Sequence, residues 1–296
     1  MKKYFLLVGT AIVLVTGCSS KKVELESISE ESTEVQQSIP FTYSFLNDDE
    51  IQHEVSALLL ENGVSQSAIN SFFTSVNHFN KLAVDTLDTK VGFETINLFD
   101  LSIDYAYIQE QWDNQTDYLD QNCRLTVFNL MKELIKIDTE DVISDEMNNL
   151  IFDEEIIKEN PNIQFTDEEA SAYHNFYTAI STKETTDQSF HVKQIQKEWK
   201  NRGIKFETDD NISIISVFLN YNEDKSLFIG HTGVLIKTDD GYLFLEKVAS
   251  MEPYIVSKYS NIDEFKAYLT ALYGNHVFDG GSKPIFMQND KWLNAE

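Results

Sequence analysis

The sequence predicts an α+β fold, with a helical N-terminal half packed on a C-terminal antiparallel sheet. Two patterns carry this prediction. In the first two thirds of the 296 residues, apolar residues recur at helical spacing behind polar capping residues. From residue 212, β-branched and aromatic runs alternate with short polar turns, which is typical of antiparallel strands. The composition, 42% hydrophobic and 24% charged, is that of a globular protein.

The expected helices begin behind Asn, Ser or Thr side chains that can accept hydrogen bonds from free N–H groups of the first turn. Glycines at 63, 203 and 274 mark helix ends. We expect helices after Asn47, after Ser65, over 123–135 behind Asn122, after Thr166, over 190–201, and after Asn261.

The expected strands lie close together in the sequence, so neighbouring strands can pair as antiparallel hairpins. Polar residues separate them, and the longest runs are rich in Ile, Val, Leu and Phe. We expect strands over 212–221, 227–237, 242–248 and 284–288.

The first eighteen residues have the features of a bacterial lipoprotein signal. Two lysines precede an apolar run over 4–15 that is too short to span a membrane as a helix. Gly17 and Cys18 then resemble the end of a lipobox, so we expect a signal peptide over 1–17 and lipidation of Cys18. Residues 18–39 are expected to be the lipidated cysteine and a disordered linker, since 19–38 is polar and lacks aromatic residues. Residues 40–296 are expected to form a single α+β domain.

These features predict a lipid anchor in the cell membrane, with the domain outside the cytoplasm. The membrane would be a partner through the N-terminal lipid alone. A net charge of −26 argues against nucleic acid as a partner. No spacing of His, Cys and acidic residues suggests a metal, and no glycine-rich phosphate loop is present, so we expect neither a metal nor a cofactor.

Cys123 is the one cysteine that lipidation would leave over. A buried free cysteine often acts only as a small apolar residue. Its expected place at a helix N-terminus, however, favours a thiolate, because free N–H groups and the helix dipole stabilise negative charge there. His231 falls inside an expected strand, where an imidazole has no packing role. A cysteine that opens a helix and a histidine on a later strand suggest a thiol nucleophile with its base.

The segment 231–236, a polar turn and the segment 242–246 resemble the histidine hairpin of NlpC-type papain-like cysteine peptidases. This resemblance implies a papain-like, NlpC-type core. It also implies that the group orienting the imidazole comes from the second strand, where Glu246 matches. The residues beside Cys123 differ from that family, which usually has Asp before the cysteine and Ser-Gly after it, whereas this chain has Asn122 and Arg124.

The position of the turn between these two strands determines which residue lies opposite His231 and could serve as the third catalytic residue. A turn over 237–240, or only 238–239, places Glu246 opposite His231. A tight turn at 240–241 offsets the two by four residues, about 13 Å, and places Ser250 opposite His231 instead.

A longer stretch of the chain, about 43–292, resembles the domain of unknown function 4300 family of lipoproteins from Gram-positive bacteria. The stretches that carry this resemblance are 122–124, 199–204, 227–233 and 244–247. It implies one domain on a lipid tether and no established activity.

Two functions remain open from the sequence. The first is a thiol hydrolase or acyltransferase acting on amide or peptide bonds of cell-wall peptides or proteins, with Cys123, His231 and Glu246 as catalytic residues and the Asn122 amide helping to hold the oxyanion. The second is a non-catalytic lipoprotein that binds a ligand or partner outside the cytoplasm. Arg202 could bind a substrate carboxylate, or it could be a surface cation before a helix end.

Overall fold

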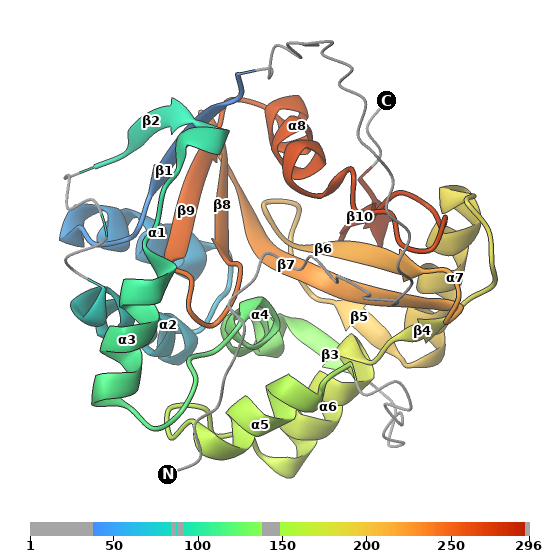
Figure 1. The fold of residues 1–296 in the computed structure, drawn as a ribbon, viewed down its shortest axis with the longest axis horizontal. Coiled ribbons are helices and arrows are strands. Elements are labelled where there is room, and N and C mark those ends of the chain that lie inside the picture. Colours follow the sequence, from blue (N-terminus) through green and yellow to red (C-terminus); the bar gives the residue numbers. More distant parts are fainter. Residues whose placement is uncertain (1–37, 84–86, 88–91, 138–148, 294–296) are drawn as a thin grey trace, which may run out of the picture.

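The structure is a computed structural model that describes residues 38–83, 87, 92–137 and 149–293 (Figure 1). Within these residues it has eight α-helices and an antiparallel sheet, so the α+β class is confirmed. The expected signal peptide, Cys18 and nearly all of the linker lie outside the described residues. No helix in the described part of the chain is long and apolar enough to cross a membrane.

Four long strands form the centre of the main sheet. They are β6 (Ile212–Tyr221), β7 (Ser226–Thr238), β8 (Gly241–Lys247) and β9 (Tyr254–Tyr259), each antiparallel to the next. Nearly all their side chains are buried, because helices cover the sheet on both sides (Figure 1). The first three of these strands were predicted from the sequence, and β9 was not.

Short strands extend this sheet at both ends. On one side β9 pairs with β1 (Pro40–Ser44), which pairs with β2 (Glu94–Asn97). On the other side β6 pairs with β10 (Ile285–Gln288), which pairs with β11 (Lys291–Trp292). The two-residue strand β4 (Ile180–Ser181) joins the start of β7, and β3 (Ile135–Ile137) with β5 (Ile204–Phe206) forms a separate ladder.

The helices lie between the strands in sequence and pack around the sheet. Capping side chains open α1, α2, α4, α6 and α8 within one residue of the predicted positions. The helices are α1 (Asp49–Glu61), α2 (Gln66–Leu82), α3 (Tyr105–Gln115), α4 (Cys123–Met131), α5 (Ile151–Glu159), α6 (Asp167–Tyr177), α7 (Gln188–Asn201) and α8 (Ile262–Tyr273).

Helix α4 begins where the sequence predicts but ends earlier. The α-helix stops at Met131, a 3-10 turn covers 132–134, and Ile135 already belongs to β3. The extension to residue 135 was therefore wrong, because apolar residues at 134 and 135 continue the helical spacing although the chain turns into a strand there. α4 contacts both β7 and β8, and in Figure 1 it lies below the β7–β8 hairpin while α8 lies above it.

The register of β7 and β8 differs from both alternatives considered above. Thr238 pairs with Gly241 across a turn made of Asp239 and Asp240, so Glu246 lies opposite Gly233. Gly233 is two residues from His231, and alternate residues of a strand share a face. His231 and Glu246 are therefore diagonal neighbours, a spacing that long side chains can bridge.

A β-bulge precedes His231. Val217 of β6 pairs with His231, whereas Phe218 pairs with Ile229, which leaves Gly230 as the extra residue. A Cβ at Gly230 would lie 2.3 Å from the half-buried Leu219 side chain, which would have to move to make room for it. Bulges bend a strand and change the direction of the next side chain, and here that side chain is His231.

Gly233→Ala should destabilise the fold by about 1–3 kcal/mol, the usual cost of overpacking a core. An added Cβ would lie 2.3 Å from the Phe244 ring and 2.8 Å from the Leu245 carbonyl oxygen. Urea unfolding measures this loss. Ser102→Ala, an exposed change in a loop, should stay within about 0.5 kcal/mol of wild type; equal stability of the two variants would contradict the close packing at Gly233.

Candidate active site

Cys123 is the first residue of α4, and its neighbour Asn122 caps the helix. The Asn122 Oδ1 atom accepts a hydrogen bond from the Leu125 N–H at 3.1 Å. The N–H groups of Cys123 and Arg124 belong to the same first turn and have no partner inside the helix. The thiol therefore stands beside the positive end of the α4 dipole.

A buried ion pair fixes this end of α4. Arg124 donates two hydrogen bonds to Asp153 of α5, from Nε at 2.6 Å and from Nη2 at 2.7 Å. Asp153 is fully buried and also accepts hydrogen bonds from Tyr173 at 2.6 Å and from the Asn122 amide nitrogen. Four donors thus converge on one carboxylate, and they join α4, α5 and α6 (Tyr173) at the residues that flank Cys123.

Arg124 also reaches the sheet. Its Nη1 atom donates to the carbonyl of Ile229 at 3.2 Å, and its guanidinium lies over the Phe228 ring at 4.8 Å. Both residues belong to β7, just before the bulge and His231. The same arginine therefore positions the cysteine helix relative to the histidine strand.

His231 is held by a carboxylate that is itself held by a tyrosine. Its Nε2 atom lies 2.8 Å from Glu246 Oε2, and the Tyr268 hydroxyl of α8 donates to the other carboxylate oxygen. All three residues are buried. The register difference noted above does not separate the pair, and it is Glu246, not Ser250 in the loop after β8, that bonds the imidazole.

Cys123 and His231 form the remaining contact. Each of the two side chains shifts the pKa of the other, so the thiol and the imidazole are close neighbours. Since Nε2 is bound to Glu246, we infer that the thiol faces Nδ1, which makes no hydrogen bond to any described residue. Cys123, His231 and Glu246 follow one another in the sequence, and their side chains are also neighbours in that order in the structure.

The contacts shift both ionisable groups toward an ion pair. Burial lowers the pKa of His231, but the neighbouring Cys123 and Glu246 side chains outweigh it and raise the pKa to about 10. Burial raises the pKa of the Cys123 thiol, but the adjacent His231 imidazole and the nearby positive charge of Arg124 bring this pKa below its ordinary value. The geometry thus favours a thiolate beside an imidazolium.

Tyr273, the last residue of α8, covers the imidazole. Its ring stacks on His231 with centroids 5.1 Å apart and planes 18° apart. Cys123 is only 3% exposed and His231 only 2%. The pair is therefore closed in this structure, and the half-buried Tyr273 is part of what covers it.

Arg202 is neither a surface cation nor free for a ligand. It is 3% exposed, pairs with Glu198 at 3.1 Å, and donates to the carbonyls of Asn175, Thr178 and Ala179. These carbonyls lie at and beyond the C-terminal end of α6, where a cation stabilises unpaired C=O groups. The guanidinium of Arg202 donates to these groups of the protein itself, so its surroundings do not support the expectation that Arg202 binds a substrate carboxylate.

Asn122 is likewise engaged. Its amide oxygen caps α4 and its amide nitrogen donates to Asp153. The expectation that this amide helps to hold an oxyanion is replaced by a positioning role, because both ends of the side chain already have partners.

Sequence reasoning missed Asp153, Tyr268 and Tyr273. Asp153 had a detectable signal, since it lies three residues before the buried Ile156 and so on the apolar face of α5, where a carboxylate needs a partner. The two tyrosines had none, because aromatic residues at helical spacing are ordinary core residues.

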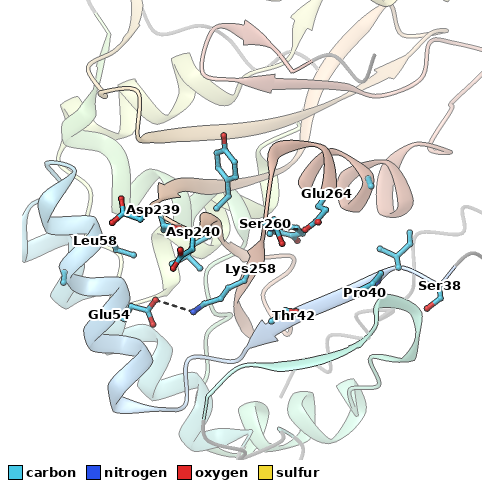
Figure 2. Close-up of a pocket in the computed structure, with 17 residues that line it drawn as sticks. Ser38, Pro40, Thr42, Glu54, Leu58, Asp239, Asp240, Lys258, Ser260 and Glu264 are labelled. Carbon is cyan, nitrogen blue, oxygen red and sulfur yellow. Dashed lines mark hydrogen bonds and ion pairs between the residues drawn. The ribbon is translucent and has the colours of Figure 1, made fainter.

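A large groove lies elsewhere, at the β7–β8 turn (Figure 2). It has a volume of about 980 Å³ and is lined by α1, β1 and α8 together with that turn. Asp239, Asp240 and Glu264 lie along it, and Lys258 pairs with Glu54 at 3.4 Å. None of its lining residues belongs to the Cys123 site.

No group of three or more His, Cys, Asp or Glu side chains in the described part of the chain could hold a metal ion.

The sequence model of one family, described as a domain of unknown function (DUF4300), matches residues 42–293. This match covers most of the chain, so the protein belongs to the DUF4300 family. No curated protein and no solved structure matches the chain.

Asp153→Ala should lower the free energy of unfolding by about 3–5 kcal/mol, because it leaves the buried Arg124 charge without its partner. Urea unfolding checks this value. Glu155→Ala, an exposed change on the same helix, is the matched control and should change the free energy by no more than about 0.5 kcal/mol. A loss below about 1 kcal/mol for Asp153→Ala would show that α4 does not depend on this ion pair.

Glu246→Gln should move the pH profile of Cys123 alkylation upward by about one unit. Removal of the carboxylate charge lowers the pKa of His231, and a less charged imidazole stabilises the thiolate less. Tyr268→Phe keeps that charge and removes only a hydrogen bond, so its profile should move less. An unchanged profile in Glu246→Gln would mean that the carboxylate does not support the imidazolium.

Proposed function

We propose that the protein is a thiol hydrolase or acyltransferase that acts on amide or peptide bonds, with a papain-like arrangement of Cys123, His231 and Glu246. The single observation that carries this proposal is the chain of contacts from thiol to imidazole to carboxylate, at the N-terminus of a helix. A buried cysteine that only filled space would need neither a charged imidazole nor a carboxylate behind it.

The chemistry follows from the positions of these groups. The Cys123 thiolate attacks the carbonyl carbon, and the new C–S bond gives a tetrahedral oxyanion. His231 then gives its proton to the leaving nitrogen as the C–N bond breaks, which leaves a thioester on Cys123. Water, or an acceptor amine, then attacks the thioester carbonyl carbon while His231 takes its proton. The C–S bond breaks and releases the acyl product, which restores the Cys123 thiolate and the His231 imidazolium.

The oxyanion would lie at the helix N-terminus. The N–H of Cys123 is a free donor of the first turn, and the α4 dipole favours negative charge there. Glu246 keeps the imidazole in one orientation and stabilises its positive form, and Tyr268 fixes Glu246. Substrate would reach the thiol by displacing the half-buried Tyr273 ring.

The N-terminal sequence supports a location for this chemistry. A lipobox-like segment ending at Cys18 and a polar linker would hold the domain on the outer side of the cell membrane. Cell-wall peptides and surface proteins are the amide substrates within reach of such an anchor.

The alternative is a non-catalytic lipoprotein that binds a ligand or partner, and one observation favours it. The large groove at the β7–β8 turn is open, while the Cys123 site is closed. In that case the Cys123 contacts would serve stability alone.

Alkylation of Cys123 as a function of pH tests the proposal. The full chain with Cys18→Ser leaves Cys123 as the one thiol, and the reagent is iodoacetamide. We expect reaction well below pH 8.5, the ordinary pKa of a thiol, and a shift of the profile toward about 8.5 in His231→Ala. A thiol that reacts only after unfolding would contradict the proposal.

Release of new amines from wall stem peptides and from protein amides measures the activity itself. Cys123→Ser is the control, because it keeps the packing and removes the thiolate. Equal amine release by wild type and Cys123→Ser would contradict thiol catalysis on these substrates.

A further inference from the structure

The groove at the β7–β8 turn lies where two neighbouring strands of the sheet part. β1 and β9 pair no further toward this end of the sheet than Thr42 and Lys258. β1 nevertheless begins at Pro40, where it pairs with β2, and β9 ends at Tyr259, where it pairs with β8. Pro40 and Tyr259 both line the groove, which has a volume of about 980 Å³, so it opens at this division of the sheet.

Apolar side chains from several elements form the walls of the groove. The half-buried Leu58 of α1 and Tyr242 of β8 both line it. Ala57 of α1 and Ala267 of α8 are exposed on the two helices beside it, and their short side chains leave the space between these helices open. A ligand that fills this space would bury apolar surface, which favours binding.

The charged side chains of the groove are mostly carboxylates. They belong to Glu54, Asp239, Asp240 and Glu264, and Lys258 is the one cation among the lining residues. Lys258 is paired with Glu54 at 3.4 Å (Figure 2). The groove therefore presents three carboxylates whose charge no lining cation balances.

These three carboxylates stand on both sides of the groove. Asp239 and Asp240 form the turn, are exposed, and make no side-chain hydrogen bond or ion pair within the described part of the chain. Glu264 accepts hydrogen bonds from the Ser260 N–H at 2.9 Å and the Asn261 amide at 3.2 Å, which orient it and leave its charge in place. In Figure 2 the two aspartates lie toward α1, whereas Glu264 lies on α8.

We propose that this groove binds a cationic peptide segment of a partner protein. Basic side chains of the segment lie beside the Asp239–Asp240 turn and beside Glu264, and apolar side chains between them fill the groove. Charge complementarity of this kind selects the partner and speeds its association, and the net charge of −26 attracts the same class of partner. The volume lies at the upper end of the roughly 300–1,000 Å³ that ligand pockets usually have. None of the lining residues belongs to the Cys123 site, so the proposal does not rest on thiol catalysis.

Binding of a short basic peptide tests this assignment. The probe is a fluorescein-labelled pentapeptide of alternating lysine and leucine, with lysine at both ends, and the protein is the full chain with Cys18→Ser. Fluorescence anisotropy at low salt, where surface charges are least screened, measures the affinity. The same peptide with glutamate in place of lysine should bind at least about tenfold more weakly, because like charges repel. Equal affinity for both peptides would overturn the proposal.

Asp239→Asn combined with Asp240→Asn should weaken binding of the lysine peptide about tenfold, or roughly threefold for each exposed carboxylate. Asparagine is also favoured in turns, so the hairpin should still form. The control, Glu223→Gln with Asp224→Asn, removes two charges from the exposed turn at the other end of β7. It should weaken binding less than twofold. An equal loss in both variants would show a diffuse attraction to the acidic surface and would overturn the proposal.

Ala267→Trp tests the place of binding without a change in charge. The large side chain would occupy the groove, so we expect at least about fivefold weaker binding of the lysine peptide. Ala106→Trp makes the same change at an exposed alanine of α3, outside the groove, and should leave the affinity unchanged. Urea unfolding shows that both variants fold. An unchanged affinity in Ala267→Trp would place the peptide elsewhere.

The outcomes separate this proposal from thiol catalysis. Cys123→Ser should bind the lysine peptide as the wild type does. An inert Cys123 in a protein that binds the peptide would contradict the proposed function alone, whereas a reactive Cys123 in a protein that does not bind it would contradict the groove alone. A dimer in light scattering that Ala267→Trp converts to a monomer would assign the groove to a second copy of this chain and overturn the proposal.

Discussion

The rest of the site depends on the buried ion pair between Arg124 and Asp153. A buried pair of this kind stabilises a fold only when its remaining atoms are satisfied, and here Tyr173 and Asn122 complete the carboxylate while Ile229 takes a third guanidinium bond. These partners come from α4, α5, α6 and β7. The ion pair therefore sets where the cysteine helix starts relative to the strand that carries His231.

In the other half of the site, on β8 and α8, each buried charged group also has a bonding partner. Glu246 of β8 holds the imidazole, and Tyr268 of α8 holds Glu246. The cost of burying each charge is offset by a neighbour of opposite charge or by a donor, so the charges alternate along the chain of contacts. This alternation is the physical reason that the thiol pKa falls and the imidazole pKa rises in spite of burial.

The features of this site that depend only on neighbouring residues in the sequence could be predicted. Cys123 at a helix N-terminus follows from the capping side chain of Asn122, and His231 follows from its place inside a strand. The register of β7 and β8 could not be settled, because a turn region of Lys, Thr, Asp, Asp and Gly permits several loops. Asp153 lies thirty residues from Cys123, and no spacing rule connects two helices at that distance. β9 was missed as well, since its polar residues Ser257 and Lys258 interrupt the apolar pattern.

Two adjacent residues of β8, Glu246 and Lys247, link the strand register to the charges of the site. Glu246 supports the imidazole, and Lys247, whose side chain leaves the strand on the opposite face, joins the β8–β9 loop to Asp120 in the loop before Cys123. A slip of one residue in the pairing would exchange the two faces and place an ammonium beside His231 and a carboxylate beside Asp120. Both networks would then meet like charge, so the charges of the site disfavour a one-residue slip of this hairpin.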